Sequence, residues 1–344
     1  MNTSKLTPTN AASSGIKLEK AQLKSLAKRR NSPAIAWLSA WLLALVGTGV
    51  LVSNALGSWW IVPAMILYGT VLTVPAYALS HECAHGTAFR SRWLNESVLW
   101  ISSLIYFEEP YHRRYSHTRH HTHTWHVGLD SQMPFDTPMT FWGWIQEVSG
   151  ISFIIYESKI FIQNALGKFN PTTIAFTPAT ELPKLKWGAR ICLLVYAATF
   201  GLIVSGIIWP LIYLVIPRLV GGPVMLLFTL PQHVEMQENS PSILESTRSY
   251  RLGAIGRFLY LNMNWHIEHH LYPQIPFYAL PGAARALRDQ LPEPDPGFFR
   301  TNWEVLMVAI RRSLGRPTKA PTIRQAPGMI GSGRDFSVTK ASMK

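Results

Sequence analysis

The chain has 344 residues, of which 48% are hydrophobic and 13 are Trp, and its formal net charge is +13. Its two cysteines, Cys83 and Cys192, are too few for a disulfide framework, a cysteine-ligated iron–sulfur cluster or a four-cysteine zinc site. The basic residues flank apolar segments and form no nucleic-acid-binding motif, so the charge indicates a membrane surface and excludes a nucleic-acid partner.

Residues 1–32 are polar, with seven Lys or Arg against one Glu. The segment lacks the apolar core of a signal peptide. We expect a basic, flexible N-terminal arm in the cytoplasm, with a short amphipathic helix near residues 17–30.

Two uncharged apolar segments follow, at residues 33–57 and 59–79, and each is long enough to cross a bilayer, which takes about 20 apolar residues. Basic residues flank the pair but are absent from the link, so the positive-inside rule predicts an outer link and cytoplasmic flanks. Residues 95–106 are apolar but too short to cross, which indicates an interfacial or re-entrant helix. A second hydrophobic block at residues 191–230 is long enough for two more spans, making four in total.

The remaining segments are more polar. Residues 141–165 predict an amphipathic helix on the membrane surface, residues 166–188 a connecting loop, and residues 277–312 cytoplasmic helices. Residues 313–344 are basic and poor in apolar residues, and we expect a disordered C-terminal tail. The sequence therefore predicts an all-α, polytopic membrane domain over residues 33–312, with four transmembrane helices and a cytosolic helical cap.

Arg218 is the one charged residue that interrupts the second hydrophobic block. We expect it near the outer turn between the two spans, next to Pro217. If Arg218 instead lies at mid-membrane, it requires a functional partner, because an unpaired charge there is costly.

Histidine occurs almost only in clusters. Six of the twelve lie within residues 112–126, two form HECAH, three form HIEHH, and one stands alone. HTRHH and HIEHH both place three histidines at i, i+3 and i+4, on one face of a helix. Histidine is the commonest metal ligand, and a solvated loop would explain one such cluster but not three. We predict a metal site with these candidate ligands: His81, His85, His117, His120, His121, His233, His266, His269 and His270.

HECAH alone also matches the HExxH pattern of zinc proteases, with Glu82 as the general base. That interpretation uses one metal and leaves most histidines unexplained, whereas eight or nine imidazoles suit two metals. His112, His123 and His126 are interpreted as loop or supporting residues. Each ligand ring needs an acceptor for its other nitrogen. The candidates close in sequence are Glu82, Asp130, Glu235, Glu268 and Asn264.

An imidazole-rich site favours redox-active iron over magnesium or calcium, which prefer oxygen ligands. Beside a membrane, such a site suits the activation of O₂ against an unactivated C–H bond. The protein would bind a long apolar substrate, hold one carbon near the metals and exclude water.

The histidine clusters resemble those of the membrane fatty acid desaturase superfamily, whose pattern is HxxxH, HxxHH and HxxHH. The resemblance covers about residues 60–285 and includes HECAHGT, RYSHTRHHTHT and NMNWHIEHHLYPQIPFYALP. It implies a non-haem diiron centre, four transmembrane helices, a cytosolic cap carrying the histidines, O₂ as co-substrate and two external electrons per turnover. His233 resembles an additional metal ligand, and Asn264 resembles a residue that holds a metal-bound water.

No HPGG motif of a fused cytochrome b5 domain and no ferredoxin cysteine pattern is visible in the sequence. We therefore expect a separate electron donor, of ferredoxin or cytochrome b5 type with its reductase.

We expect an O₂-dependent membrane oxidoreductase that introduces a double bond into a fatty acyl chain. A hydroxylase or ketolase of an alkane, a carotenoid or another amphiphile is the alternative on the same scaffold. A zinc protease and a histidine-rich metal transporter are the alternatives from other classes. We expect both termini in the cytoplasm, and the cytoplasmic membrane of a bacterium or the endoplasmic reticulum of a eukaryote as the location.

Overall fold

The computed structural model describes residues 15–133 and 137–318. Within these ranges the chain is helical and contains no strand, apart from a single isolated bridge between Tyr250 and Asp295. The helices of the first half are α1 (Lys20–Leu26), α2 (Ser32–Ala55), α3 (Ile61–Ala84), α4 (Arg92–Tyr106), α5 (Pro110–Thr122), α6 (Phe141–Val148), α7 (Ile151–Leu166) and α8 (Pro171–Phe176). Those of the second half are η2 (Ala179–Glu181), α9 (Leu182–Val204), η3 (Leu211–Val215), α10 (Ile216–Thr229), η4 (Leu230–Gln232), α11 (Ile243–Ser246), α12 (Ala254–Leu259), α13 (His266–Leu271), α14 (Leu280–Ala286) and α15 (Phe298–Ser313).

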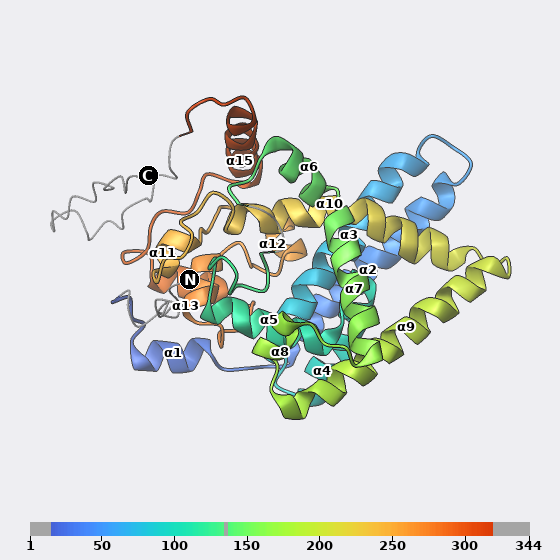
Figure 1. Cartoon of the computed structure of the whole chain (residues 1–344), viewed down its shortest axis with the longest axis horizontal. Helices are drawn as coiled ribbons and strands as arrows, with labels where there is room; N and C mark the ends of the chain where they lie inside the picture. Colours follow the sequence, from blue (N-terminus) through green and yellow to red (C-terminus); the bar gives the residue numbers. More distant parts are fainter. Residues whose placement is uncertain (1–14, 134–136, 319–344) are drawn as a thin grey trace.

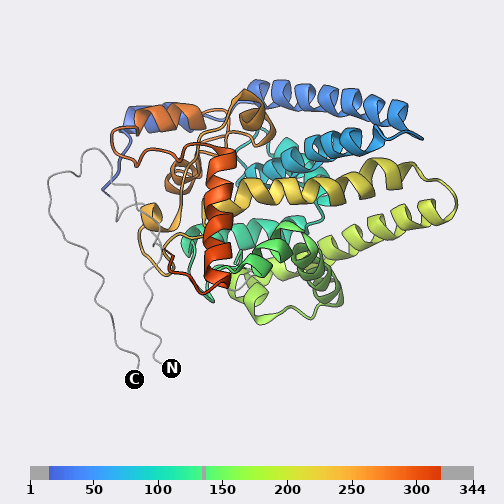
Figure 2. The same ribbon diagram turned by 90° about the horizontal axis from the view of Figure 1, so that it is seen from above.

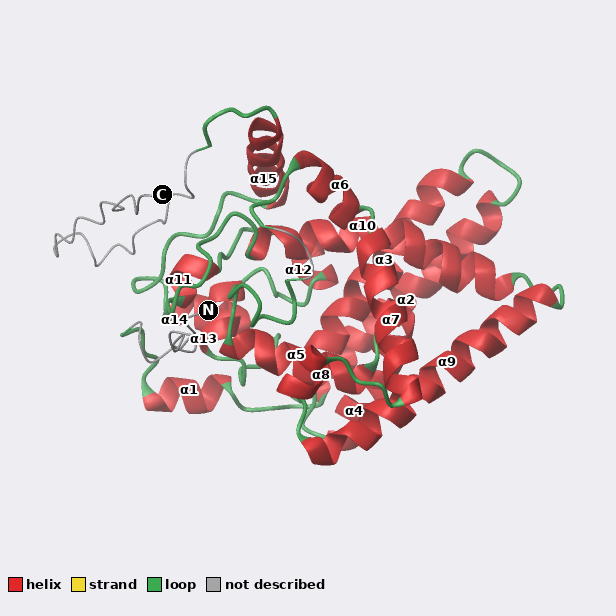
Figure 3. Cartoon of the chain, in the orientation of Figure 1, coloured by secondary structure: helices red, strands yellow, loops and turns green. Residues whose placement is uncertain are grey.

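Four stretches of helix are long and apolar enough to cross a membrane: Ser32–Ala55, Ile61–Ala84, Ala179–Val204 and Leu211–Gln232. They extend from one end of the molecule, and their connecting turns lie at the opposite end from α1 (Figures 1 and 2). The shorter helices and most loops gather at the end away from these turns, and we call that end the cap (Figure 3). The predicted all-α fold with four candidate spans and a cap is confirmed, and it fits an integral membrane protein.

Two predicted boundaries are wrong. The third span begins well before residue 191, and part of the expected loop at 166–188 is helical, in α8 and in the first turns of α9. Those turns carry Lys184 and Lys186, whose long stems can reach the membrane surface while the helix continues, so hydropathy places the start of the helix too late. The expected surface helix at 141–165 is two helices, because Gly150 adopts a left-handed conformation with φ of 76°.

Part of the N-terminal arm packs against the cap, and its flexibility stays a prediction. Ile16 and Leu18 are buried in an apolar cluster of the cap. The Leu18 N–H donates to the Tyr272 hydroxyl at 2.9 Å. The expected helix at 17–30 is confined to α1, which packs against α14. Residues 1–14 and most of the expected tail, from residue 319, lie outside the described residues.

Arg218 lies inside the fourth span and not at its outer turn. It is roughly 10 Å along the helix from Leu211, in a hydrocarbon core about 30 Å thick. Its Nε–H donates at 2.8 Å to the carbonyl oxygen of Tyr106, the last residue of α4. Its guanidinium also lies 4.5 Å from the Tyr106 ring centre and 5.4 Å from that of Phe153. The partner that a charge at this depth requires is therefore a helix C-terminus together with two aromatic faces.

The second and fourth spans touch through their backbones. A Cβ on Gly221 of α10 would lie 2.0 Å from the carbonyl oxygen of Gly69 on α3. Small residues permit such close approach between membrane helices. The contact aligns the end of α3, which carries HECAH, with the end of the fourth span, which leads directly into His233.

We predict that Gly221→Ala destabilises the bundle, because the new methyl group forces α3 and α10 apart. Overpacking of this kind costs about 1–3 kcal/mol. The thermal unfolding midpoint in detergent should fall. Gly201→Ala is the matched control, because nothing lies within 4 Å of its added Cβ. Equal midpoints for the two variants would contradict the close packing.

Candidate metal centre

Four segments bring the candidate histidines together. HECAH forms the last turn of α3 and its cap residue, His85. The HTRHH triplet lies on α5, where Pro110 occupies the first turn and the Glu109 carboxylate accepts the N–H groups of Tyr111 and His112. His233 follows η4, and the HIEHH triplet occupies the single turn and a half of α13.

All nine predicted histidines fall into two groups, each with ring nitrogens within 4.8 Å of one another. The first group is His81, His85, His117, His121 and His269. The second group is His120, His233, His266 and His270. Each triplet is divided between the two groups. Helix α5 gives two rings to the first group and one to the second, and α13 gives one ring to the first group and two to the second. The groups are adjacent, because the rings of His121 and His270 stack with centres 4.2 Å apart.

The ring nitrogens converge within each group. In the first, Nε2 of His121 lies 3.0 Å from Nε2 of His117 and 3.2 Å from that of His269. In the second, Nε2 of His266 lies 3.0 Å from that of His233 and 3.1 Å from that of His270. An imidazole nitrogen has one proton or one lone pair, so pairwise hydrogen bonds cannot satisfy three of them. Nitrogens about 2.1 Å from a shared cation and at right angles would be about 3 Å apart, which these distances fit.

Burial favours the neutral form of several of these rings, which is the form that binds metals. It lowers the pKa of His85 and of His233 to about 3. In both groups, burial and the neighbouring imidazoles also lower the pKa of further histidines well below the usual value of the side chain. The rings affected in this way are His117, His121, His266, His269 and His270.

Several rings are oriented through the nitrogen that faces away from the group. Nδ1 of His120 donates to the Asp130 carboxylate at 2.8 Å, as the sequence predicts. The other acceptors were not predicted, because no motif distinguishes them from ordinary loop residues. They are Gln132 Oε1 for His117 at 3.0 Å, the Ser246 carbonyl for His233 at 2.9 Å and Thr124 Oγ1 for His270 at 3.2 Å.

Glu82 has a different position from the one that a zinc protease requires. Its carboxylate lies 3.6 Å from Nδ1 of His81 and 4.0 Å from Nδ1 of His269, behind the rings. It also accepts the Phe277 N–H and the Thr87 hydroxyl. A general base would have to face the open side of the metal, so this geometry does not favour the protease.

The other sequence candidates for ring support are not in contact with a ring. Glu235 forms an ion pair with Arg312 at 2.7 Å, and Glu268 accepts the Ser249 hydroxyl at 2.7 Å, so both expectations are wrong. Asn264 donates to the Tyr250 carbonyl, and its buried Oδ1 accepts no hydrogen bond from the described residues. Its role beside a metal-bound water stays a prediction. The remaining three histidines lie outside both groups: His112, His123 and His126.

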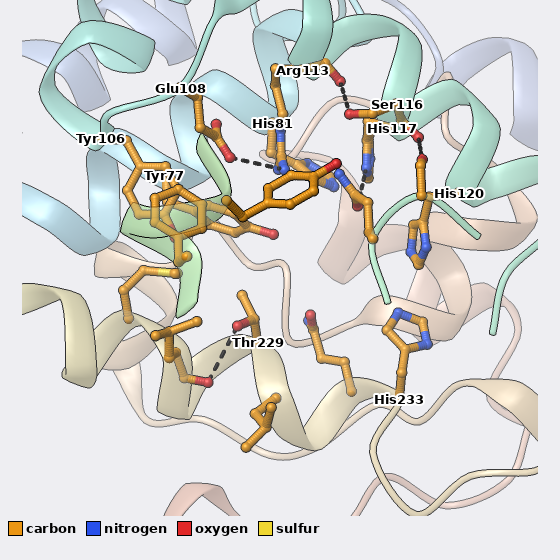
Figure 4. A pocket seen from close by; sticks show the side chains of 18 of the residues that line it. Tyr77, His81, Tyr106, Glu108, Arg113, Ser116, His117, His120, Thr229 and His233 are labelled. Carbon is orange, nitrogen blue, oxygen red and sulfur yellow. Dashed lines mark hydrogen bonds and ion pairs between the residues drawn. The ribbon is translucent and has the colours of Figure 1, made fainter. Parts of the chain in front are cut away.

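A cavity of about 160 Å³ adjoins both histidine groups (Figure 4), and we call it the reaction cavity. Its wall includes His81 and His117 from the first group and three rings from the second, together with apolar and aromatic side chains. Buried charged residues that sequence reasoning missed line it as well. Glu108 pairs with Arg113 at 3.4 Å, and burial raises the pKa of Glu157 well above its usual range.

Residues 57–302 match the family model described as fatty acid desaturase. The chain belongs to the fatty acid desaturase family. An sn-1 oleoyl-lipid 12-desaturase of Anabaena variabilis is 24% identical, over 79% of this chain and 82% of that protein. A Delta(12) fatty acid desaturase of Mortierella isabellina is 26% identical, over 73% of this chain and 72% of that protein. An sn-1 acyl-lipid omega-3 desaturase (ferredoxin) of Nostoc sp. is 23% identical, over 73% of this chain and 74% of that protein. Membership of this family makes the chain an oxidoreductase.

We predict that Asp130→Asn lowers metal affinity by about 10- to 100-fold, because the His120 ring loses the charged acceptor that orients it. Metal content of the purified protein at limiting metal concentration measures this. Glu268→Gln is the control, since this buried carboxyl contacts Ser249 and no ring of either group. Equal metal retention by the two variants would contradict the role of Asp130.

Proposed function

We propose that this chain is an O₂-dependent membrane desaturase that holds two iron ions between its nine clustered histidines and introduces a double bond into a fatty acyl chain. The observation that carries the proposal is the convergence of two groups of imidazole nitrogens beside one cavity. Bound iron would supply the oxidising chemistry with O₂ that an unactivated C–H bond requires.

The chain's own residues bind and position. His81, His85, His117, His121 and His269 would hold one ion, and His120, His233, His266 and His270 the other. Asp130 keeps the His120 ring in one tautomer, with its proton on Nδ1 and its lone pair directed at the group. Met225, Leu226 and Phe153 give the reaction cavity an apolar wall that suits a hydrocarbon chain.

Double-bond formation removes two hydrogens from the acyl chain. Two external electrons and two protons then balance the reduction of O₂ to two waters. The name of the Nostoc relative includes the word ferredoxin, which supports a separate carrier of ferredoxin type for this chain. The exposed basic residues Lys17, Lys20, Lys24, Arg29 and Arg30 at the cap suit an acidic carrier. Their position before the first span also supports a cytoplasmic cap.

We predict that His120→Ala and His269→Ala, one from each group, both abolish turnover and lose at least one of two irons per chain. No neighbouring side chain can replace a missing imidazole nitrogen in so closely packed a group. Iron analysis and single-turnover product formation measure the two effects. His123→Ala, outside both groups, should keep iron and activity. Normal activity of His120→Ala would contradict the ligand assignment.

The product distinguishes desaturation from its alternative. Lipids of cells that express the intact chain should contain acyl chains lighter by two hydrogens, and cells that express His269→Ala should lack them. A gain of one oxygen would instead identify a hydroxylase or ketolase. Mass spectrometry of total lipids measures both outcomes in the same sample.

A further inference from the structure

A second cavity, of about 510 Å³, lies between the third and fourth spans. Its lining is almost entirely apolar and includes Val195, Thr199 and Ile203 of α9, and Leu211, Val215 and Leu219 of the fourth span. α9 packs on α7, whereas α10 packs on α3, so the two spans diverge from their connecting turn (Figure 1). We call this space the bilayer cavity, because it lies between two helices that are each long and apolar enough to cross a membrane.

The two cavities follow each other along one helix. Leu211, Val215 and Leu219 line the bilayer cavity, and Met225 and Thr229, further along the same span, line the reaction cavity. From Leu211 to His233 the helix extends roughly 33 Å, about the thickness of the hydrocarbon core. An acyl chain lying along this helix would therefore pass from the bilayer to the histidines without crossing water.

Side chains that line the two cavities contact one another, and we call Tyr106, Phe153 and Arg218 the contact layer. Tyr106 and Phe153 line the reaction cavity, and Arg218 lines the bilayer cavity. The Tyr106 and Phe153 ring centres are 4.9 Å apart, and the Arg218 guanidinium lies over both rings. The hydrogen bond from Arg218 to the Tyr106 carbonyl fixes the guanidinium in the contact layer. A cation is costly beside an apolar space unless it is paired, and the contacts that pair Arg218 also hold it between the two cavities.

We propose that the bilayer cavity is the portal through which the acyl chain of a membrane lipid reaches the histidines, and that Arg218, Tyr106 and Phe153 close it when it is empty. The inference rests on the proposed function and names the substrate class, an acyl chain still attached to a bilayer lipid. The apolar lining and the position within the bilayer favour this occupant over a water-soluble thioester, which would approach from the aqueous side.

The test uses the full chain in phosphatidylcholine nanodiscs, doped with a phosphatidylcholine whose acyl chain carries a diazirine near its methyl end. After irradiation, labelled residues are identified by peptide mass spectrometry, and turnover is measured in the same nanodiscs. We expect labels on the portal residues and on Phe153 and Met225. Thr199→Trp, which fills the portal, should reduce the labelling of Met225 at least fivefold and lipid turnover at least tenfold, with iron content unchanged.

Leu194→Trp is the matched control. Leu194 lies on the same helix, is 70% exposed and does not line the cavity, so neither labelling nor turnover should change. Phe153→Ala provides a second variant if Thr199→Trp does not fold. It removes part of the contact layer and should raise the labelling of Met225 at least twofold.

Two results would overturn the portal. Labels spread evenly over all bilayer-facing helices would identify ordinary surrounding lipid. Wild-type turnover in Thr199→Trp despite lost labelling would mean that substrate takes another route. Portal labelling in a wild-type chain that forms no product would instead refute the proposed function and leave the portal in place.

Discussion

The structure depends on the convergence of nine imidazoles, seven of which belong to buried residues. Lone pairs about 3 Å apart repel each other, and burial removes the water that would otherwise satisfy them. Either a cation lies between them or the fold carries an uncompensated cost. Because the rings come from α3, α5, α13 and the segment after η4, a bound cation would also join the cap to the membrane helices. Metal binding and folding of the cap are then coupled.

The membrane part supplies the rigid base for this centre. The backbone contact between Gly69 and Gly221 fixes α3 against α10, and those two spans lead into His81 and His233. α9 has no comparable contact with α10, and the space between them remains open. The bundle is thus close-packed between α3 and α10, where it positions ligands, and loosely packed between the third and fourth spans.

The sequence is informative where the physical signal is local. The four spans follow from apolar length, and the helical triplets from histidine spacing, so these parts could be predicted. The supports for the rings could not, apart from Asp130, because Gln132, Thr124 and Ser246 acquire their role only through tertiary contacts. Arg218 was misplaced for the same reason: its partner, the carbonyl of Tyr106, is 112 residues away in the chain.

The division of each triplet between the two groups has a consequence for how such a protein can vary. Each added residue turns the following side chains of a helix by about 100°. One insertion within HTRHH would therefore remove rings from both groups at once, because α5 contributes to both. Beyond Gln132, the long segment that leads to His233 contributes no ring to either group and returns the chain to the centre. Length changes should be tolerated between the histidine clusters and excluded within them. The spacing inside each cluster determines which ring joins which group.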